Sequence, residues 1–245
     1  GAVMKTYFAE KLGVSPDQIF TLSIMPCVAK KGEREMNLFY GEYAGHDIDT
    51  VLTTRELTRM IRAAHIDPKS LKDRECDPLM KEWSGAGVIF GTTGGVMEAA
   101  LRSAHYLVTG RNPDPDAFKI VRNPGGQPGV VEAEIQLGDA TVRAAVVSGL
   151  GNTRKLIEAI EHGEVHYDFV EVMACRRGCM AGGGQPVPIG ARTKAARYEG
   201  LYRIDDASQI KRSNDNPIVG ELYEGLLKGK EHKLLHNNSD LPQAK

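Results

Sequence analysis

The segment from Glu171 to Pro186, EVMACRRGCMAGGGQP, constrains this chain more than any other part of its sequence. Cys175 and Cys179 lie four residues apart, and a backbone that curls at Gly178 can bring both thiols to one metal centre. The run Gly182 to Gln185 allows the backbone to approach a bulky inorganic group and to donate N–H groups to it. Two buried thiols in a Gly-rich turn, or a zinc site, are alternatives for this segment taken alone.

A second cysteine segment, MPCVAKKGE, follows an apolar run from Ile19 that predicts a buried strand ending at Pro26 and Cys27. A cysteine at the end of a strand, close to Lys30, is favoured as a thiolate and suits metal or redox chemistry. Taken alone, the segment is better explained as a buried strand-end cysteine beside solvated lysines.

The glycine-rich run Gly91-Thr-Thr-Gly-Gly95 follows residues 86–90, which we predict to be a short buried strand. It precedes a predicted helix whose apolar positions have helical spacing: Val96, Ala99, Ala100, Ala104 and Leu107. The run lacks both the dinucleotide fingerprint and the Gly-Lys-Ser/Thr ending of a phosphate loop. An anion site at the helix N-terminus and close backbone packing are therefore equally good interpretations.

Composition excludes several classes of function. Hydrophobic residues make up 41% of the 245 residues and charged residues 26%, and the net charge of -1 gives no basic excess for nucleic acid. No apolar run reaches the roughly 18–20 residues that span a bilayer, so a soluble intracellular protein is expected. Four cysteines are too few for a disulfide scaffold.

Cys76 lies between acidic residues that disfavour a thiolate, and we place it on an exposed loop. The histidine pairs His162/His166 and His232/His236 lack the glutamate of a zinc protease.

The remaining patterns predict an α/β chain with at least partly parallel sheets. We expect a first helix that ends near Gly13, a capped turn at Ser15, and a capping box at Thr53 that opens a helix to about Ala64. Trp83 is expected in the core. The other predicted elements are a loop from Cys27 to Met36, strands at 118–121, 130–137, 140–147 and 168–173, a helix from 152 or 153 to 160, and a last helix from 217 to 227.

The start of the chain suggests a fragment. Gly1 is not a start residue, and the first eleven residues read as the body of a helix with no N-cap before it.

The combination of segments resembles a known family. A Met-Pro-Cys-x-x-Lys-x-x-Glu motif, followed by Glu-x-Met-Ala-Cys-x-x-Gly-Cys-x-x-Gly-Gly-Gly-Gln-Pro, is similar to the second and third signature motifs of [FeFe]-hydrogenases. Residues 87–102 and the tail from Gln209 through His236 are also similar to that family. The resemblance covers essentially the whole chain. It implies a two-lobed catalytic domain, present in part, with its site between the lobes.

The resemblance implies an H-cluster, a [4Fe–4S] cube joined through a cysteine sulfur to a two-iron centre with CO, CN⁻ and a bridging dithiolate. Cys27 and Cys175 would bind the cube, and Cys179 would bridge the two parts. Lys30 would donate a hydrogen bond to a cyanide, with Glu33 as its own partner. The other implied site residues would form the walls of the pocket or contact the cluster: Met25, Met173, Pro26, Phe90, Gly91, Gly182 and Gln185.

The implied reaction is reversible heterolysis of H₂, with a ferredoxin as the usual electron partner and dedicated maturases that load the cluster. The family's first cysteine motif would lie before residue 1, so the fourth cube ligand is missing and this chain alone is expected to be inactive. Arg176-Arg177 stand where many members have Pro-Gly.

The expected organisation is a large-subunit region over residues 1–190 and a small-subunit-like helical segment over 191–245. The parent protein is expected in the cytoplasm of an anaerobic prokaryote. Two other interpretations remain: a non-catalytic relative such as an iron–sulfur assembly factor, and a sensory module that binds the cluster to signal.

Overall fold

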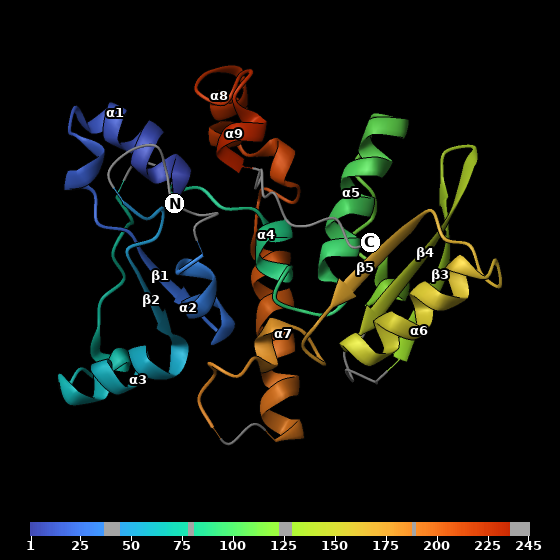
Figure 1. Cartoon of the computed structure of the whole chain (residues 1–245), viewed down its shortest axis with the longest axis horizontal. Helices are drawn as coiled ribbons and strands as arrows, with labels where there is room; N and C mark the ends of the chain where they lie inside the picture. The colour runs from blue at the N-terminus through green and yellow to red at the C-terminus, as the bar shows by residue number, and fades with distance from the viewer. Residues whose placement is uncertain (37–44, 78–80, 123–128, 188–189, 236–245) are drawn as a thin grey trace. The chain divides into compact units, whose positions relative to one another are not determined.

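The protein is described here by a computed structural model that covers residues 1–36, 45–77, 81–122, 129–187 and 190–235 (Figure 1). The chain forms two compact units. Unit 1 contains residues 1–82, 183–186 and 217–245, and unit 2 contains residues 83–182 and 187–216.

Unit 2 is built on a three-stranded sheet in the order β3-β4-β5. The strands β3 (Gly129–Leu137) and β4 (Ala140–Ser148) form the antiparallel hairpin that the sequence predicts, and β5 (Phe169–Met173) pairs in parallel with β4. The last five residues of β4 are all buried, as expected for a central strand covered on both faces. The predicted α/β class with a partly parallel sheet is confirmed.

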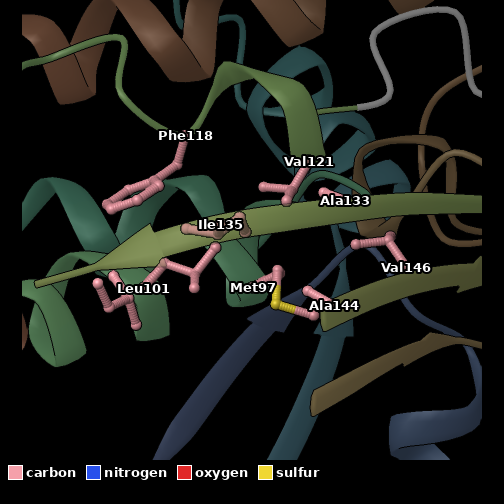
Figure 2. Close-up of a cluster of buried hydrophobic side chains, with 9 residues drawn as sticks. Met97, Leu101, Phe118, Val121, Ala133, Ile135, Ala144 and Val146 are labelled. Atoms are coloured by element: carbon pink, nitrogen blue, oxygen red, sulfur yellow. The ribbon is translucent and has the colours of Figure 1, made fainter. Parts of the chain in front are cut away.

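Two helices cover the two faces of this sheet. Helix α5 (Gly95–Thr109) supplies Met97 and Leu101 to a core with Ala144, Val146 and residues of β3 (Figure 2). Helix α6 (Leu150–Glu161) buries Leu156 against Ala145 and Val147, which alternate with the first pair along β4. Leu156 is buried in this contact, whereas Ile157 and Ile160 of the same helix are exposed.

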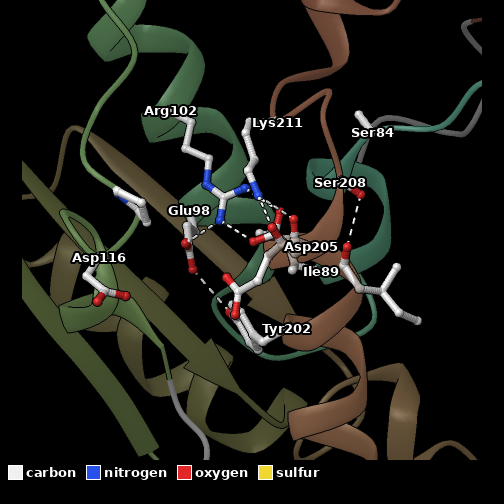
Figure 3. Close-up of polar contacts among 12 residues, drawn as sticks. Ser84, Ile89, Glu98, Arg102, Asp116, Tyr202, Asp205, Ser208 and Lys211 are labelled. Atoms are coloured by element: carbon white, nitrogen blue, oxygen red, sulfur yellow. Dashed lines mark hydrogen bonds and ion pairs between the residues drawn. The ribbon is translucent and has the colours of Figure 1, made fainter.

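A buried polar network joins α5 to the long helix α7 (Ala191–Ala207). Arg102 donates to both carboxylate oxygens of Asp205, at 2.8 and 2.6 Å, and to Glu98 at 2.7 Å (Figure 3). Glu98 also accepts from Arg122 at 2.7 and 2.6 Å and from the Tyr202 hydroxyl at 3.1 Å. Each buried charge therefore has a partner of opposite sign, the condition for burying ionised groups.

Three sequence predictions in unit 2 are wrong. Residues 86–90 are not a strand: helix α4 (Gly85–Ile89) begins there, because Ser84 accepts a hydrogen bond from the Gly87 amide as an N-cap. Residues 118–121 contain a 3-10 turn, Lys119–Val121, instead of a strand. Trp83 is 62% exposed and is not part of the core.

The buried face of α5 also differs from the prediction. Met97, Leu101 and Ala104 face the hairpin, at spacings of four and three residues, whereas Leu107 is 78% exposed. The sequence contains two overlapping apolar stripes. The position of the β3–β4 hairpin decides which of them is buried.

Unit 1 contains a parallel pair of short strands, β1 (Leu22–Met25) and β2 (Thr50–Thr53), in which Met25 pairs with Thr53. Helix α3 (Thr54–Ala63) follows β2, and its predicted capping box is confirmed: Thr53 and Glu56 exchange hydrogen bonds. The turn at Pro16–Gln18 also has the predicted capping box, and the first helix ends at Gly13 with φ 64°.

The first helical segment consists of a π turn, Met4–Phe8, followed by α1 (Ala9–Leu12). It packs against the chain's last described helices, α8 (Pro217–Glu224) and α9 (Glu231–Leu235). Tyr7 shares a buried cluster with Leu222 and Leu227, and its hydroxyl donates to Glu221 at 2.8 Å. The predicted last helix ends earlier than residue 227, and His236 lies outside the described residues.

Two predictions in unit 1 need correction. The segment after Cys27 is not all loop, because α2 (Ala29–Arg34) forms there and is supported by Lys30–Glu33 and Lys31–Glu56 ion pairs. Strand β1 is shorter than predicted, and its Leu22 and Ile24 are exposed, so it is not a buried strand. A short Pro68–Ser70 turn completes this part of unit 1. Across the residues placed by the structure, no helix is long and apolar enough to cross a membrane.

Candidate functional site

The two-cysteine loop of unit 2 begins where β5 ends. Cys175 is exposed two residues beyond Met173, and Cys179 opens a 3-10 turn, Cys179–Ala181, in a partly buried position. Between them the backbone reverses through two positive φ values, 74° at Arg177 and 79° at Gly178. The curl that the sequence predicted at Gly178 is therefore present, and Arg177 shares it.

This loop packs directly on the Gly91–Gly95 run. A Cβ atom at Gly178 would lie 2.8 Å from the Gly91 oxygen and from backbone atoms of Thr92 and Thr93, so only glycine fits there. The Met180 amide donates to the Gly91 oxygen at 2.9 Å. Gly95 is equally crowded, because a Cβ there would lie 1.8 Å from the Ile89 oxygen. Close backbone packing, one of the two interpretations of this run, is what the structure shows.

An anion does lie at the N-terminus of α5, and it belongs to the protein. The Glu171 carboxylate accepts hydrogen bonds from the amides of Gly94 at 2.7 Å and Met97 at 2.6 Å. Burial raises the pKa of Glu171, and the amides of Met97 and Gly94 oppose that rise. The helix terminus that the sequence offered as an anion site is thus occupied by a side chain of β5.

The Cys27 segment of unit 1 packs against the glycine run 183–184. The Gly184 amide donates to the Pro26 oxygen at 2.8 Å, and a Cβ at Gly184 would lie 2.9 Å from the Pro26 carbonyl and 3.1 Å from the Cys27 nitrogen. Gly183 lies beside Val28. The glycines that follow the two-cysteine motif in sequence therefore form a close backbone contact with the other cysteine segment.

Arg55, near the start of α3, holds this contact in place. Its guanidinium donates to the Gly183 oxygen at 2.9 Å and to the Gln185 oxygen at 2.9 and 3.1 Å, while its amide donates to the Gly184 oxygen at 2.9 Å. Four hydrogen bonds from one residue thus fix residues 183–185 within unit 1. This role of Arg55 was not predicted, because nothing in the local sequence links it to residues far along the chain.

A cavity of about 310 Å³ opens beside the Cys27 segment. Met25, Lys30 and Glu33 all line it, and the Lys30 ammonium lies 2.8 Å from the Glu33 carboxylate. The predicted pairing of Glu33 with Lys30 is confirmed. The cavity places a soft thioether and a paired cation on the same surface, and both come from the segment that carries Cys27.

The predicted site residues thus fall into two groups. Unit 1 contains Met25, Pro26, Cys27, Lys30, Glu33 and Gln185, and unit 2 contains Phe90, Gly91, Met173, Cys175, Cys179 and Gly182. Phe90 ends α4 and is 45% exposed. Cys76 is exposed, as predicted. In the part of the chain that the structure describes, no three side chains among His, Cys, Asp and Glu form a group that could hold a single metal ion.

The role of Glu171 was missed as well, although the sequence contains a sign of it. Glu171 is the one charged residue in the strand FVEVM, and a carboxylate in an apolar strand needs a buried partner. The partner amides belong to the glycine-rich start of α5, for which the sequence predicts either an anion site or close packing.

The residues of both units fit an iron–sulfur group. The four cysteines, all among the described residues, are not joined in disulfides, and Cys27, Cys175 and Cys179 are half-buried or exposed. Each lies on a loop with close backbone packing, at Gly178 for the unit 2 pair and at Pro26 and Gly184 for Cys27. Thiolates presented in this way are the usual ligands of such groups.

Comparison with known proteins agrees with this donor set. Residues 1–183 match the family model of the iron-only hydrogenase large subunit, C-terminal domain, and residues 191–238 match that of the iron hydrogenase small subunit. The second match is divided between the two units: residues 191–216 group with unit 2 and later residues with unit 1. The predicted boundary at residue 190 remains a prediction.

Individual relatives include hydrogenases and an assembly factor. The NADP-reducing hydrogenase subunit HndD of Solidesulfovibrio fructosivorans is 39% identical over 97% of this chain and 41% of its own length. The cytosolic iron-sulfur assembly component 3 of Mus musculus is 31% identical over 96% of this chain and 50% of its own length. A solved structure of apo [FeFe]-hydrogenase HydA1 from Chlamydomonas reinhardtii matches with a TM-score of 0.79 at 36% identity, over 96% of this chain and 66% of that one.

The chain therefore spans half or less of the length of these two curated relatives. Its first family model alone covers about three quarters of the sequence, from residue 1 to residue 183. The fold, the cysteine segments and these matches agree, and the chain belongs to the family of the iron-only hydrogenase large subunit, C-terminal domain.

Proposed function

We propose that this chain is part of an [FeFe]-hydrogenase catalytic domain, and that the parent protein catalyses the reversible reaction of two protons and two electrons to H₂. The observation that carries the proposal is the cavity of unit 1, which Met25, Lys30 and Glu33 line together and which all three reach from the segment that carries Cys27. A site for a cube alone needs thiolates but no cation and thioether in a shared cavity. This combination suits a second, anionic group beside the cube.

Each residue has a proposed task. Cys27, Cys175 and Cys179 would hold the cluster through their thiolates, with Cys179 serving the two-iron part. Met25 and Met173 form soft walls around that centre. Pro26 and Phe90 keep water out, while Gly91, Gly182 and Gln185 offer backbone contacts. When bound, the H-cluster supplies the iron chemistry that forms and cleaves H₂.

Lys30 is the residue whose task depends most on geometry. Its ammonium is paired with Glu33 at 2.8 Å, and both residues line the cavity. A cation held in this way would donate a charge-assisted hydrogen bond to an anionic ligand of the bound cluster. Glu33 is in this respect a partner that orients Lys30.

The family resemblance extends the proposal to partners. A ferredoxin or similar carrier exchanges electrons with the parent protein, hydrogenase maturases load the two-iron centre, and the protein works in the cytoplasm. The chain by itself lacks the family's first cysteine motif, so we propose that it is inactive alone.

The second candidate function is iron–sulfur assembly without hydrogen chemistry. It is favoured by the 31% identity to the assembly component of Mus musculus. Lys30, Met25 and Met173 distinguish the two, because an assembly factor has no need to surround a two-iron centre. A sensory role would require a regulatory domain in the parent gene.

Iron binding by the chain tests the ligand set. Under anaerobic conditions with ferrous iron and sulfide, the purified chain should take up iron and show charge-transfer absorbance. The single changes Cys27→Ser, Cys175→Ser and Cys179→Ser should each reduce the bound iron, whereas the matched control Cys76→Ser should not. Equal iron in all four variants would refute the ligand assignment.

Activity tests the reaction itself. The chain joined to its natural upstream region is matured with the hydrogenase maturases without oxygen, and H₂ evolution is measured with a reduced dye. Lys30→Ala should abolish retention of the two-iron centre, seen as loss of the infrared bands of CO and CN⁻, while the fold survives. A folded, cluster-loaded protein without turnover would support the assembly or sensory function instead.

A further inference from the structure

The two-cysteine loop of unit 2 is attached to the Gly91–Gly95 run at both of its ends. After the cysteines, the Met180 amide donates to the Gly91 oxygen, and Gly178 lies against the same backbone with no room for a side chain. Before them, the Glu171 side chain reaches the start of α5. The loop is thus held between two attachments to one short segment.

The Glu171 attachment is the stronger of the two. Each carboxylate oxygen accepts one hydrogen bond from a backbone N–H, at 2.7 Å from Gly94 and 2.6 Å from Met97. The whole Glu171 residue is only 5% exposed. Charge-assisted hydrogen bonds are roughly twice as strong as neutral ones, and the positive end of the α5 dipole adds to them. An aspartate would be one methylene too short to bridge the same two amides.

The position of Glu171 in β5 relates this attachment to the cysteines. Residues two apart in a strand point to the same face, so Glu171 and Met173 share one face of β5. The strand ends at Met173, whose oxygen accepts a hydrogen bond from the Gly149 amide at 2.8 Å, and Cys175 follows two residues later. Fixing Glu171 therefore fixes both the face that Met173 presents and the point where the chain leaves the sheet.

We propose that Glu171 is a positioning residue that sets the geometry of the Cys175–Cys179 loop by binding the amides of Gly94 and Met97. The binding of an iron–sulfur cluster by this loop rests on the proposed function. The ordering of the loop by Glu171 is independent of the proposed function, so the two claims are tested separately.

The test uses the whole 245-residue chain, free of iron and without oxygen. The isosteric change Glu171→Gln retains the shape but turns an amide N–H₂ toward one backbone donor. The matched control is Glu134→Gln, because Glu134 is an exposed glutamate on β3 of the same sheet. Alkylation by iodoacetamide is followed at each cysteine by peptide mass spectrometry, with exposed Cys76 as the internal reference.

Glu171→Gln should raise the alkylation rate of Cys179 relative to Cys76 about tenfold, the expected effect of losing a hydrogen bond to a charged group. Cys27 in unit 1 should not change, and Glu134→Gln should behave like the unaltered chain. Unchanged rates at Cys175 and Cys179 would overturn the proposal. An equal rise at Cys27 relative to Cys76 would also overturn it, because that pattern reports general unfolding.

A second measurement needs no variant. Hydrogen exchange in the unaltered chain should show the Gly94 and Met97 amides strongly protected, although Gly94 is the N-cap and Met97 lies in the first turn of α5, where amides usually exchange quickly. Rapid exchange at both amides would overturn the proposal. Loss of iron in the cysteine variants tests the proposed function alone, so the failure of one claim leaves the other intact.

Discussion

Arg102 of α5 binds Asp205 of α7 through two hydrogen bonds of 2.8 and 2.6 Å, although 103 positions separate the two residues in sequence. Both side chains are buried. The pair joins a residue in the part that matches the large-subunit family model to a residue in the part that matches the small-subunit model.

Arg102→Met should destabilise unit 2 by about 3–5 kcal/mol, because the change leaves the Asp205 carboxylate buried without its cation. Chemical denaturation followed by circular dichroism measures the effect. The double change Arg102→Met with Asp205→Leu should recover part of the loss, since no buried charge then lacks a partner. Arg143→Met is the control, because Arg143 is exposed beside Glu134, and its cost should stay within about 0.5 kcal/mol. A similar cost for both arginines would contradict the prediction.

Leu101→Ala should cost about 2–5 kcal/mol of the free energy of unfolding, because Leu101 is buried against the β3–β4 hairpin. Leu107→Ala, on the same helix but 78% exposed, should cost little. Thermal unfolding of the two variants compares them directly. Equal costs would mean that the buried face of α5 is misassigned.

Arg177→Gly should stabilise the chain by about 0.5–1 kcal/mol. Arg177 has φ 74°, a backbone conformation that costs a residue with a side chain roughly 1–2 kcal/mol. Glycine avoids this cost, but its greater freedom in the unfolded chain offsets part of the gain. This is also the position at which many relatives were expected to have glycine. His65→Gly, at φ 52°, serves as the comparison and should show a gain of the same sign. A clear loss of stability at residue 177 would show that the arginine side chain stabilises the loop.

Because of Glu56, the stability of α3 should decrease as the pH falls into the acid range. Hydrogen bonds from Lys31, the Thr53 amide and the Thr53 hydroxyl lower the pKa of Glu56 from 4.5 to about 2. A carboxyl group whose pKa is lowered on folding stabilises the fold fully above the unfolded pKa and loses this effect as the pH falls toward the folded pKa. The difference in unfolding midpoint between the unaltered chain and Glu56→Ala should therefore be full above pH 4.5 and shrink toward pH 2.

The matched control for that measurement is Glu10→Ala, a change at an exposed glutamate in α1. The comparison separates the loss of the hydrogen bonds to Glu56 from the general effect of removing a carboxyl group. A Glu56 effect that is the same at both ends of the range would rule out the ion pair with Lys31 as its source.

The parts of the fold that local sequence determines were predicted well. The glycine at residue 13 and the capping boxes at Ser15 and Thr53 act within one helical turn, so each can be recognised from four or five letters. The hairpin and β5 were also recognised, because their strands are long or strongly apolar.

The failures occur where distant residues decide the structure. The run from Gly85 to Ile89 is short and apolar and is equally compatible with a strand, but its first amides donate to the oxygens of Ile210 and Lys211, more than a hundred residues later. The same holds for the candidate site. The cysteines are recognisable by motif, whereas Glu171 and Arg55 bind backbone atoms that are distant in sequence.

The segment 183–186, fixed to α3 by Arg55, has a consequence for the order in which the chain folds during synthesis. All three strands of the unit 2 sheet, and both helices that cover it, lie between residues 83 and 182, so this sheet is available to fold as soon as that stretch has left the ribosome. Residues 1–82 are made first but must wait for residues 183–186, roughly 5–20 seconds later at about 5–20 residues per second. The segment that carries Cys27 is therefore synthesised early and is among the last parts of this chain to reach its final structure.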